Sequence, residues 1–312
     1  MKIAILDDYQ NVALGLAEWN RLDATITVFN HPIGDEDAIA TALVDFDVIV
    51  CMRERTAFPI NLINRLTALK LMITTGMRNR SIDVDAAKAK GIMVCGTLGT
   101  GSPTSELAWA LILGLMKNLP KDDRSMRDGE WQPNLGLDLM GKTLGLLGLG
   151  KLGEATAKVG LAFGMDVIAW SQNLTDSRAA EVGATRVEKD ALFANADVLS
   201  IHLVLSERSR GLIGARELGL MKPSSYLVNT SRGPIVDEAA LLTALRDNQI
   251  AGAGLDVYAV EPLPADHAFR SLDNTVLTPH MGYVTHENYA AWYSQIIENI
   301  EGFINGAPVR GL

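Results

Sequence analysis

The stretch "GKTLGLLGLGKLGEATAKVGLAFGMDVIAWS", residues 141–171, holds three glycines in the pattern G-x-G-x-x-G, at Gly148, Gly150 and Gly153. A strand-like apolar run precedes the pattern, a helical stretch opens within it, and a second strand-like run follows, as in a β-α-β unit of about 30 residues. In such a unit the glycines allow a tight turn, close approach of the backbone to a pyrophosphate, and close packing of helix on strand. The N–H groups at the helix start favour phosphate. The stretch therefore predicts a dinucleotide site, with a purely structural glycine turn as the alternative.

The second strand of this unit ends without the acidic residue that commonly holds the adenosine ribose 2′-hydroxyl. Ser171 stands at that position, followed by Gln172 and Asn173. Without a carboxylate, nothing there repels the 2′-phosphate of NADP, but no arginine is adjacent to bind one, and the next downstream is Arg178. The sequence therefore predicts a cofactor, NAD or NADP, and leaves the choice between them open.

The alternation of strands and helices extends in both directions from the glycine stretch. From residue 141 onward six runs have strand character: "KTLGLLGLG", "DVIAW", "DVLSIHL", "SYLVNT", "AGAGLDV" and "TVLTPH". Residues 1–97 contain five more: "KIAIL", "TITVF", "DVIVCM", "LKLMIT" and "GIMVCG". Strands that are apolar along their whole length and alternate with helices indicate parallel sheets covered on both faces. We therefore predict an α/β protein of two doubly wound parallel-sheet domains with a cleft between them.

The composition is that of a soluble globular protein: 312 residues, 48% hydrophobic and 21% charged, with a net charge of −9. This charge argues against a broad nucleic-acid surface and against a polybasic membrane patch. Cys51 and Cys95 lie in apolar runs, which predicts buried structural thiols, and nothing suggests a metal site. The N-terminus has the pattern of a first strand, and no apolar run approaches the ~20 residues that span a bilayer. We expect a cytoplasmic protein.

The segment "GTGSPTSELAWALILGLMKNLP" predicts a long apolar helix. Ser102 is the expected N-cap, Pro103 suits the first helical position, and Pro120 is expected to end the helix. Because its apolar character is nearly continuous, we expect it to be buried against a second domain or a second subunit.

Three polar residues follow apolar strands in the second half of the chain: Arg232 in "LVNTSRGPIVDE", Glu261 in "LDVYAVEPLP" and His280 in "VLTPHMG". The carboxyl ends of strands in a doubly wound sheet line the ligand crevice, so these side chains are predicted to lie together beside the cofactor. Any one of them taken alone would be read as a surface ion pair or a satisfied polar residue.

With these motifs the sequence resembles the D-isomer-specific 2-hydroxyacid dehydrogenases over essentially its whole length. The densest similarity lies in "DLMGKTLGLLGLGKLG", "ADVLSIHLVLSERSRGLIG", "MKPSSYLVNTSRGPIVDEAAL", "GLDVYAVEPLP" and "TPHMG", with Arg232, Glu261 and His280 spaced as in that family. The resemblance implies that His280 exchanges a proton with the substrate oxygen, that Glu261 orients the imidazole, and that Arg232 grips the substrate carboxylate. It also implies a set of residues lining the cofactor: Thr104, Gly148, Gly150, Lys151, Leu152, Gly153, Ser171, His202, Thr230 and Asp256.

The resemblance further implies a flavodoxin-like substrate domain, residues 1–98 completed by the C-terminal helix 288–312, and a Rossmann cofactor domain, residues 99–287. In the substrate domain "TTGMRNRSID" departs from the glycine-rich loop that the family uses to hold the substrate carboxylate. Arg78 stands at the position of a glycine there, which leads us to predict a cationic substrate side built from Arg53, Met77, Arg78 and Asn79 together with Arg232. Arg55 and Arg80 are expected to be solvated surface charges.

The activity expected from the resemblance is reduction of a small 2-oxo acid such as glyoxylate or hydroxypyruvate. The alternatives are a phosphoglycerate- or phosphite-type dehydrogenase, and a dinucleotide-sensing binding protein like the co-repressors of the same fold. We also expect a homodimer joined through the cofactor domain, with the apolar helix that contains Trp109 at the interface.

Overall fold

The computed structural model describes all residues, 1–312, and divides into two compact units. Unit 1 comprises Met1–Gly101 and Val284–Leu312, and unit 2 comprises Ser102–Tyr283. The boundaries predicted from the sequence were placed after residues 98 and 287. No helix is both long enough and apolar enough to cross a membrane.

Unit 1 is built on a five-stranded sheet in the order β2-β1-β3-β4-β5, with every pair of neighbours parallel. This is the flavodoxin-like order, as predicted. All five predicted strands are present: β1 (Lys2–Ile5), β2 (Thr25–Val28), β3 (Val48–Cys51), β4 (Leu71–Thr74) and β5 (Met93–Cys95). Side chains of β3 and β4 are buried along the whole strand, which explains their unbroken apolar sequences.

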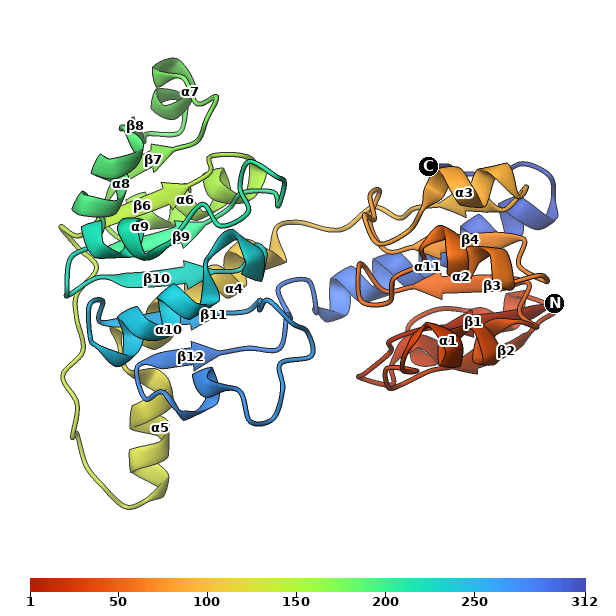
Figure 1. Ribbon diagram of the computed structural model, residues 1–312, viewed down its shortest axis with the longest axis horizontal. Coiled ribbons are helices and arrows are strands. Elements are labelled where there is room, and N and C mark those ends of the chain that lie inside the picture. Colours follow the sequence, from red (N-terminus) through yellow and green to blue (C-terminus); the bar gives the residue numbers. More distant parts are fainter. The chain divides into compact units, whose positions relative to one another are not determined.

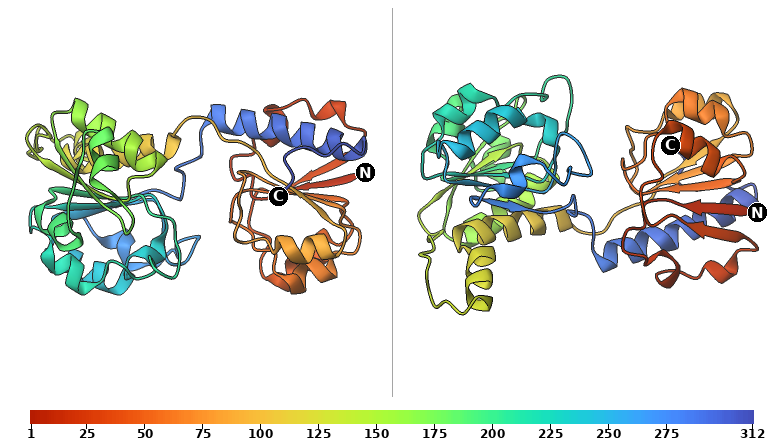
Figure 2. Two further views of the ribbon diagram at one scale, coloured as in Figure 1. Left: turned by 90° about the horizontal axis from the view of Figure 1, so that it is seen from above. Right: turned by 60° about the horizontal axis from the view of Figure 1, so that its bottom comes forward.

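Helices cover both faces of the unit 1 sheet (Figure 2). One face carries α1 (Glu36–Leu43), α2 (Ile60–Arg65) and α3 (Val84–Ala89), and the opposite face carries the C-terminal α11 (His286–Ile304). The short helices η1 (Ala13–Gly15) and η2 (Trp19–Arg21) complete the unit. The side chains of Asp35 and Asp83 cap α1 and α3 by accepting from backbone N–H groups, which fixes where these helices start. Both cysteines are free and buried, as predicted, and burial raises the pKa of the Cys51 thiol.

Unit 2 is built on a seven-stranded parallel sheet in the order β12-β11-β10-β9-β6-β7-β8 (Figure 1). The six predicted strands are β6 (Thr143–Leu147), β7 (Asp166–Trp170), β9 (Val198–Ile201), β10 (Tyr226–Asn229), β11 (Gly252–Leu255) and β12 (Thr275–Leu277). The seventh, β8 (Thr185–Arg186), was not predicted because its two residues form no apolar run. The order matches a Rossmann sheet with an added edge strand. From β6 the chain adds β7 and β8 on one side and then β9 to β12 on the other, so the strand order changes direction between β6 and β9.

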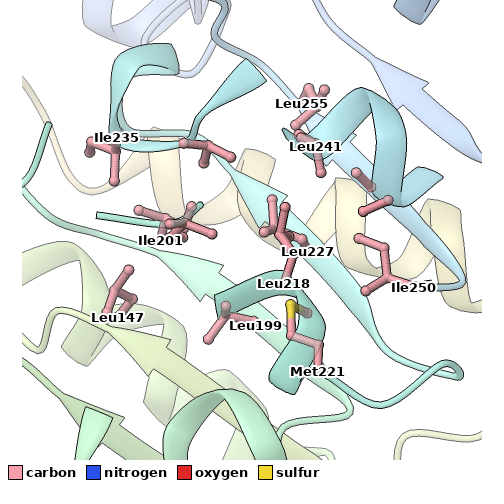
Figure 3. Close-up of a cluster of buried hydrophobic side chains, with 14 of the residues drawn as sticks. Leu147, Leu199, Ile201, Leu218, Met221, Leu227, Ile235, Leu241, Ile250 and Leu255 are labelled. Carbon is pink, nitrogen blue, oxygen red and sulfur yellow. The ribbon is translucent and has the colours of Figure 1, made fainter. Parts of the chain in front are cut away.

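Helices also cover both faces of the unit 2 sheet. On one face lie α4 (Pro103–Met116) and α6 (Lys151–Ala162), and on the other α8 (Lys189–Asn195), α9 (Ala215–Leu220) and α10 (Glu238–Arg246). Figure 3 shows the core beneath the second group, a cluster of buried side chains that includes Leu199, Leu227 and Leu241. The remaining elements are α5 (Leu119–Arg127), α7 (Asp176–Glu181), η3 (Gly233–Ile235) and η4 (Ala268–Ser271).

The apolar helix α4 differs from its prediction in two respects. It ends at Met116, before Pro120, which instead stands in the first turn of α5. Ser102 is the N-cap residue, but its side chain makes no capping hydrogen bond. Trp109 itself is 5% exposed in the single chain and donates from Nε1 to the Thr156 carbonyl at 3.2 Å, so its indole packs within unit 2. A subunit interface on the outer side of this helix stays a prediction.

Candidate active site

The glycine turn between β6 and α6 shows a different physical requirement at each glycine. Gly148 has φ +108°, and a Cβ there would lie 2.8 Å from the His202 carbonyl oxygen. A Cβ on Gly153 would lie 2.2 Å from the Gly148 carbonyl oxygen, so the helix can approach the turn only without a side chain. Gly150 is the N-cap of α6, and a Cβ on it would meet no protein atom within 4 Å. Two glycines therefore close the turn, and the third leaves space where a pyrophosphate can reach the helix start.

Two buried polar atoms without protein partners lie at the ends of strands that follow this turn. They are Nδ1 of His202, directly after β9, and Oγ1 of Thr230, directly after β10. Buried polar atoms are normally hydrogen-bonded, so orphaned ones in a ligand crevice fit a bound polar molecule. Burial lowers the pKa of His202 to about 4, so this imidazole is neutral near pH 7 and is a hydrogen-bonding group, not a cation. Its Nε2 lies 2.9 Å from Ser200 Oγ.

Paired substitutions in the turn separate its binding role from its folding role. We expect Gly153→Ala to lower the free energy of unfolding by about 1–3 kcal/mol, because the added Cβ collides with backbone that cannot move alone. We expect Gly150→Ala to leave stability within about 0.5 kcal/mol of wild type, since its φ of −82° suits alanine and the space is open. Urea unfolding and NADH binding would be measured on both. Equal loss of stability in the two variants would contradict these roles.

Three further residues predicted to line the cofactor flank the turn. Lys151 and Leu152 are the first two residues of α6, and Lys151 is exposed. Ser171 directly follows β7, and its carbonyl accepts from the Leu174 N–H at 3.1 Å. The three lie at one edge of the sheet because β6 and β7 are parallel neighbours.

His280 and Glu261 lie in direct contact. His280 Nδ1 is 2.5 Å from Glu261 Oε2, and Oε1 of the same carboxylate accepts from the Tyr258 N–H at 2.9 Å. Burial alone would raise the pKa of Glu261, but the hydrogen bond and the charge of His280 outweigh it and hold this pKa below its usual value. An ionised carboxylate can only accept, so Nδ1 carries the proton and Nε2 is the ring nitrogen left for another partner. The side chain of His280 is 22% exposed and that of Glu261 is 32% exposed.

The loop that presents His280 is held by groups that the sequence suggested for the cofactor. His280 has φ +51°, an unusual backbone conformation for a residue other than glycine. The buried carboxylate of Asp256 accepts from Thr278 Oγ1 at 2.6 Å, Met281 N at 2.8 Å and Gly282 N at 3.0 Å. Burial raises the pKa of Asp256. Three donors on one carboxylate therefore fix the turn on which His280 stands.

Thr104 holds the same turn from α4, because its Oγ1 donates to the Gly282 carbonyl at 2.9 Å. A Cβ on Gly282 would lie 3.1 Å from Thr104 and 3.2 Å from Asp256, which explains a glycine two residues after His280. The polar atoms of Thr104 and Asp256 are thus already engaged within the protein, and any contact of either with the cofactor stays a prediction.

Arg232 stands in a turn braced on both sides. The side chain of Asn229 donates to the Arg232 carbonyl at 3.0 Å, and Ser231 Oγ donates to the Ile201 carbonyl at 2.8 Å, which ties the turn to β9. On the other side Gly233 lies against the loop that carries Glu261, since a Cβ on Gly233 would be 2.1 Å from the Tyr258 carbonyl. The charge of Arg232 contributes to the lowered pKa of Glu261. Arg232, Glu261 and His280 are therefore brought to one edge of the unit 2 sheet.

Sequence reasoning missed two residues that hold the Glu261 loop. The hydroxyl of Tyr258 donates to the carbonyls of Leu255 at 3.0 Å and Thr278 at 2.9 Å, which links the ends of β11 and β12. Glu238, at the start of α10, accepts from the Ala259 N–H at 3.1 Å and contacts His267 Nε2 at 3.0 Å. Only Tyr258 could have been found from the sequence, because it is a large aromatic residue with a hydroxyl directly after a predicted apolar strand. Glu238 could not, because acidic residues are common in the first turn of a helix.

The residues predicted for the substrate in unit 1 follow β3 and β4. Arg53 has φ +51°, and its Nη1 donates to the Thr75 carbonyl at 3.1 Å. Met77 and Arg78 are exposed. Asn79 is 8% exposed, and its amide donates to the Arg53 carbonyl and to Thr74 Oγ1 and accepts from Ser81 N. Its side chain thus shapes the loop, and the assignment of all four residues to a substrate stays a prediction.

Arg55 is not the solvated surface charge that was expected. Its Nη1 donates to the Asp7 carbonyl at 2.8 Å, and its guanidinium lies 4.5 Å from the centre of the Tyr9 ring. A planar cation on an aromatic face is a stabilising arrangement inside unit 1. Arg80 is exposed, as expected.

Comparison with known proteins decides the family. Residues 109–282 match the family description "D-isomer specific 2-hydroxyacid dehydrogenase, NAD binding domain". The chain belongs to the D-isomer-specific 2-hydroxyacid dehydrogenase family. The match with the NAD-binding domain of these dehydrogenases supports a nicotinamide dinucleotide as the ligand of the glycine turn.

Several members of the dehydrogenase family resemble the chain along most of its length. The glyoxylate reductase of Thermococcus litoralis is 37% identical over 255 residues, which cover 78% of this chain and 77% of that protein. The hydroxypyruvate reductase of Thermotoga maritima is 35% identical over 272 residues, covering 85% and 87%. A crystal structure of a phosphoglycerate oxidoreductase from Vibrio cholerae o395 has 38% identity and a TM-score of 0.93, covering 98% of this chain and 100% of that one.

The carboxylate–imidazole pair of this dehydrogenase should be visible in its acid stability. Because the pKa of Glu261 is lowered on folding from its usual 4.5, the pair stabilises the protein above pH 4.5, and this contribution is lost as the pH falls through the folded-state value. We expect the stability difference between wild type and Glu261→Gln to be largest near pH 7 and to shrink below pH 4.5. Urea unfolding across this range measures it. The exposed Glu130→Gln is the control, and a difference that is independent of pH would contradict the expectation.

Proposed function

We propose that the protein is a nicotinamide-dependent reductase of a small 2-oxo acid, of the glyoxylate or hydroxypyruvate type. The observation that carries this proposal is the direct contact of His280 with Glu261 beside the Arg232 turn, at the strand ends that follow the glycine turn. The arrangement provides a proton donor, a group that orients it, and a cation for a carboxylate. The names of the relatives in Thermococcus litoralis and Thermotoga maritima support the choice of substrate class.

The proposed chemistry divides between the cofactor and three side chains. When bound, the nicotinamide gives a hydride to the carbonyl carbon of the 2-oxo acid or takes it back from the 2-hydroxy acid. His280 gives a proton from Nε2 to the carbonyl oxygen during reduction and recovers it during oxidation. Glu261 keeps the proton on Nδ1 and balances the positive charge of the ring. Arg232 binds the carboxylate of the acid, ideally through two parallel hydrogen bonds that also orient the carbonyl.

Three alternatives are distinguished by the experiment below: a phosphoglycerate dehydrogenase, a phosphite dehydrogenase and a dinucleotide sensor. The chain spans about half the length of the curated D-3-phosphoglycerate dehydrogenases that it matches, 50% in the case of the Synechocystis protein. Phosphite oxidation would use the same three side chains. A dinucleotide sensor would need the glycine turn, but it would have no use for the paired Glu261 and His280.

The test is a spectrophotometric assay at the absorbance of the reduced nicotinamide. Purified protein would be given NADH or NADPH with glyoxylate, hydroxypyruvate, pyruvate, 2-oxoglutarate and 3-phosphohydroxypyruvate, and in the reverse direction phosphite with NAD. We expect the highest kcat/KM with glyoxylate or hydroxypyruvate. Preference for 3-phosphohydroxypyruvate or phosphite would move the assignment to those reactions. Dinucleotide binding without any turnover would favour the sensor.

We also propose a homodimer, with an interface different from the one predicted. Large apolar side chains that are more than half exposed gather in residues 119–140 of unit 2: Leu119, Met126, Trp131, Leu135 and Met140. Trp131 is 76% exposed and Leu135 92% exposed. Monomers rarely leave such large apolar groups in water over one continuous segment. Sedimentation of wild type should give a dimer and that of a Trp131→Ser, Leu135→Ser variant a monomer. A monomeric wild type would refute this part of the proposal.

A further inference from the structure

An open hollow of about 470 Å³ lies beside the glycine turn in unit 2. Its lining comes from the start of α4, the first two turns of α6 and the first turn of α7, and comprises Ser102, Lys151, Glu154, Ala155, Lys158 and Arg178. Three of these six side chains are cationic and one is anionic. A hollow with this charge next to a turn that binds a pyrophosphate is suited to a further phosphate group.

Glu154 is the only acidic side chain of the hollow, and it is bonded to two of the cations. Its Oε2 accepts from Arg178 Nη2 at 2.5 Å, and its Oε1 accepts from Lys158 Nζ at 2.8 Å. These hydrogen bonds lower the pKa of Glu154, so it is ionised near pH 7. The other side of the guanidinium, Nη1, donates to Glu181 at 3.0 Å. The charge of Arg178 is thus matched on both sides by carboxylates.

Arg178 is also the arginine nearest in sequence to the end of β7. Thr175, the N-cap of α7, accepts from the Arg178 backbone N–H at 3.2 Å, which places Arg178 in the first turn after the loop that begins at Ser171. That loop is where a doubly wound fold holds the adenosine ribose. Ser171 has no charge to repel a 2′-phosphate. Discrimination against such a phosphate would therefore have to come from another residue.

We propose that Glu154 makes the protein selective for NAD over NADP, because it occupies Arg178 and keeps a negative charge in the hollow. A 2′-phosphate carries a charge near −2, as other phosphate monoesters do at neutral pH. To bind Arg178 it would have to displace a carboxylate already bonded there, and the displaced carboxylate would then repel it. The proposal rests on the nicotinamide site proposed above, and it assigns to Glu154 the selective role that an acidic residue at the end of β7 has elsewhere.

The experiment uses two nucleotides that differ only in the 2′-phosphate, 5′-AMP and 2′,5′-ADP, with dissociation constants measured by calorimetry on the full-length protein. We expect wild type to bind 5′-AMP at least as tightly as 2′,5′-ADP. Glu154→Gln should tighten 2′,5′-ADP binding by roughly 10-fold or more, the worth of one hydrogen bond to a charged group, and leave 5′-AMP unchanged. In the double variant Glu154→Gln, Arg178→Gln this gain should disappear.

A matched control separates the local effect from a general change of charge. Glu188→Gln removes the same charge from a carboxylate that pairs with Arg186 at 3.0 Å and does not line the hollow. It should leave both dissociation constants unchanged. Thermal unfolding of each variant would confirm that the substitutions preserve the fold.

The outcomes distinguish failure of this inference from failure of the proposed function. If wild type binds 5′-AMP, but Glu154→Gln leaves the ratio of the two constants unchanged, the inference is wrong and the nicotinamide site stands. The same conclusion holds if the gain survives loss of Arg178, or if Glu188→Gln produces it equally. If wild type binds neither nucleotide, the cofactor site itself is wrong and the inference falls with it.

Discussion

Replacing His280 with alanine is expected to reduce turnover by roughly 10²–10⁴-fold, the usual worth of general acid–base catalysis. The reason is the geometry of the ring. Nδ1 is held by Glu261 at 2.5 Å, so Nε2 is the one nitrogen positioned to exchange a proton with a substrate. The loop itself should survive the substitution, because it is fixed by the Asp256 carboxylate through backbone N–H groups and through Thr278. Binding of NADH should therefore remain near the wild-type value.

The matched control for this prediction is His286→Ala. His286 is an exposed histidine at the start of α11, and it contributes to none of the contacts of the candidate site. It should retain full activity. Steady-state kinetics with the best 2-oxo acid, together with NADH binding by fluorescence, would be measured on both variants. Near-normal turnover of His280→Ala would remove this residue from the mechanism, whereas loss of NADH binding would mean that the substitution had disturbed the loop.

The fold was largely predictable because its signals are local. A parallel strand buried on both faces has to be apolar throughout, so β3 and β4 are visible in the sequence as short unbroken runs. The glycine turn was visible for a similar reason, since Gly148 and Gly153 lie where any side chain would strike backbone. What was missed has no such local signal. Strand β8 has two residues and no apolar run.

The end of α4 was predicted wrongly from the rule that a proline ends a helix. Its end was placed at Pro120, but the chain turns earlier, at Asn118 with φ +52°, and proline then fits the first turn of α5. Its apolar face was expected to be buried against a second domain or a second subunit, because sequence cannot tell which large surface will cover a helix. The sheet of its own unit does so.

The site was predictable as a set of residue types but not as a network. Strand ends pointed to Arg232, Glu261 and His280, since parallel strands bring their carboxyl ends to one edge. The partners of a side chain depend on loops whose conformation is not written in a short motif. Asp256 holds the His280 turn through backbone donors, and Asn79 is buried within its own loop. Neither role can be read from a short motif. Both side chains accept hydrogen bonds from backbone N–H groups, and such groups are present in almost every residue.

Replacing Arg232 with alanine is expected to damage both KM and kcat, and to reduce kcat/KM by roughly 10²–10⁴-fold. A guanidinium that binds a carboxylate through two charge-assisted hydrogen bonds contributes about 1.5–3 kcal/mol for each of them. Affinity falls because the carboxylate loses its cation, and turnover falls because the carbonyl is no longer oriented toward His280 Nε2. The turn should keep its shape, since Asn229 and Ser231 brace it through atoms that the substitution leaves in place.

Arg232→Lys is the informative companion, because lysine keeps the charge but cannot make the planar two-bond contact. We expect it to recover part of the lost affinity and little of the lost turnover, which would separate attraction of the carboxylate from its orientation. Glu261 lies close enough to feel the charge of Arg232, so the lysine should also retain the low pKa of that carboxylate better than alanine does. An unchanged KM in Arg232→Ala would place the substrate carboxylate elsewhere. In that case the role of Arg232 would be to keep Glu261 ionised beside His280, and it would not bind the substrate.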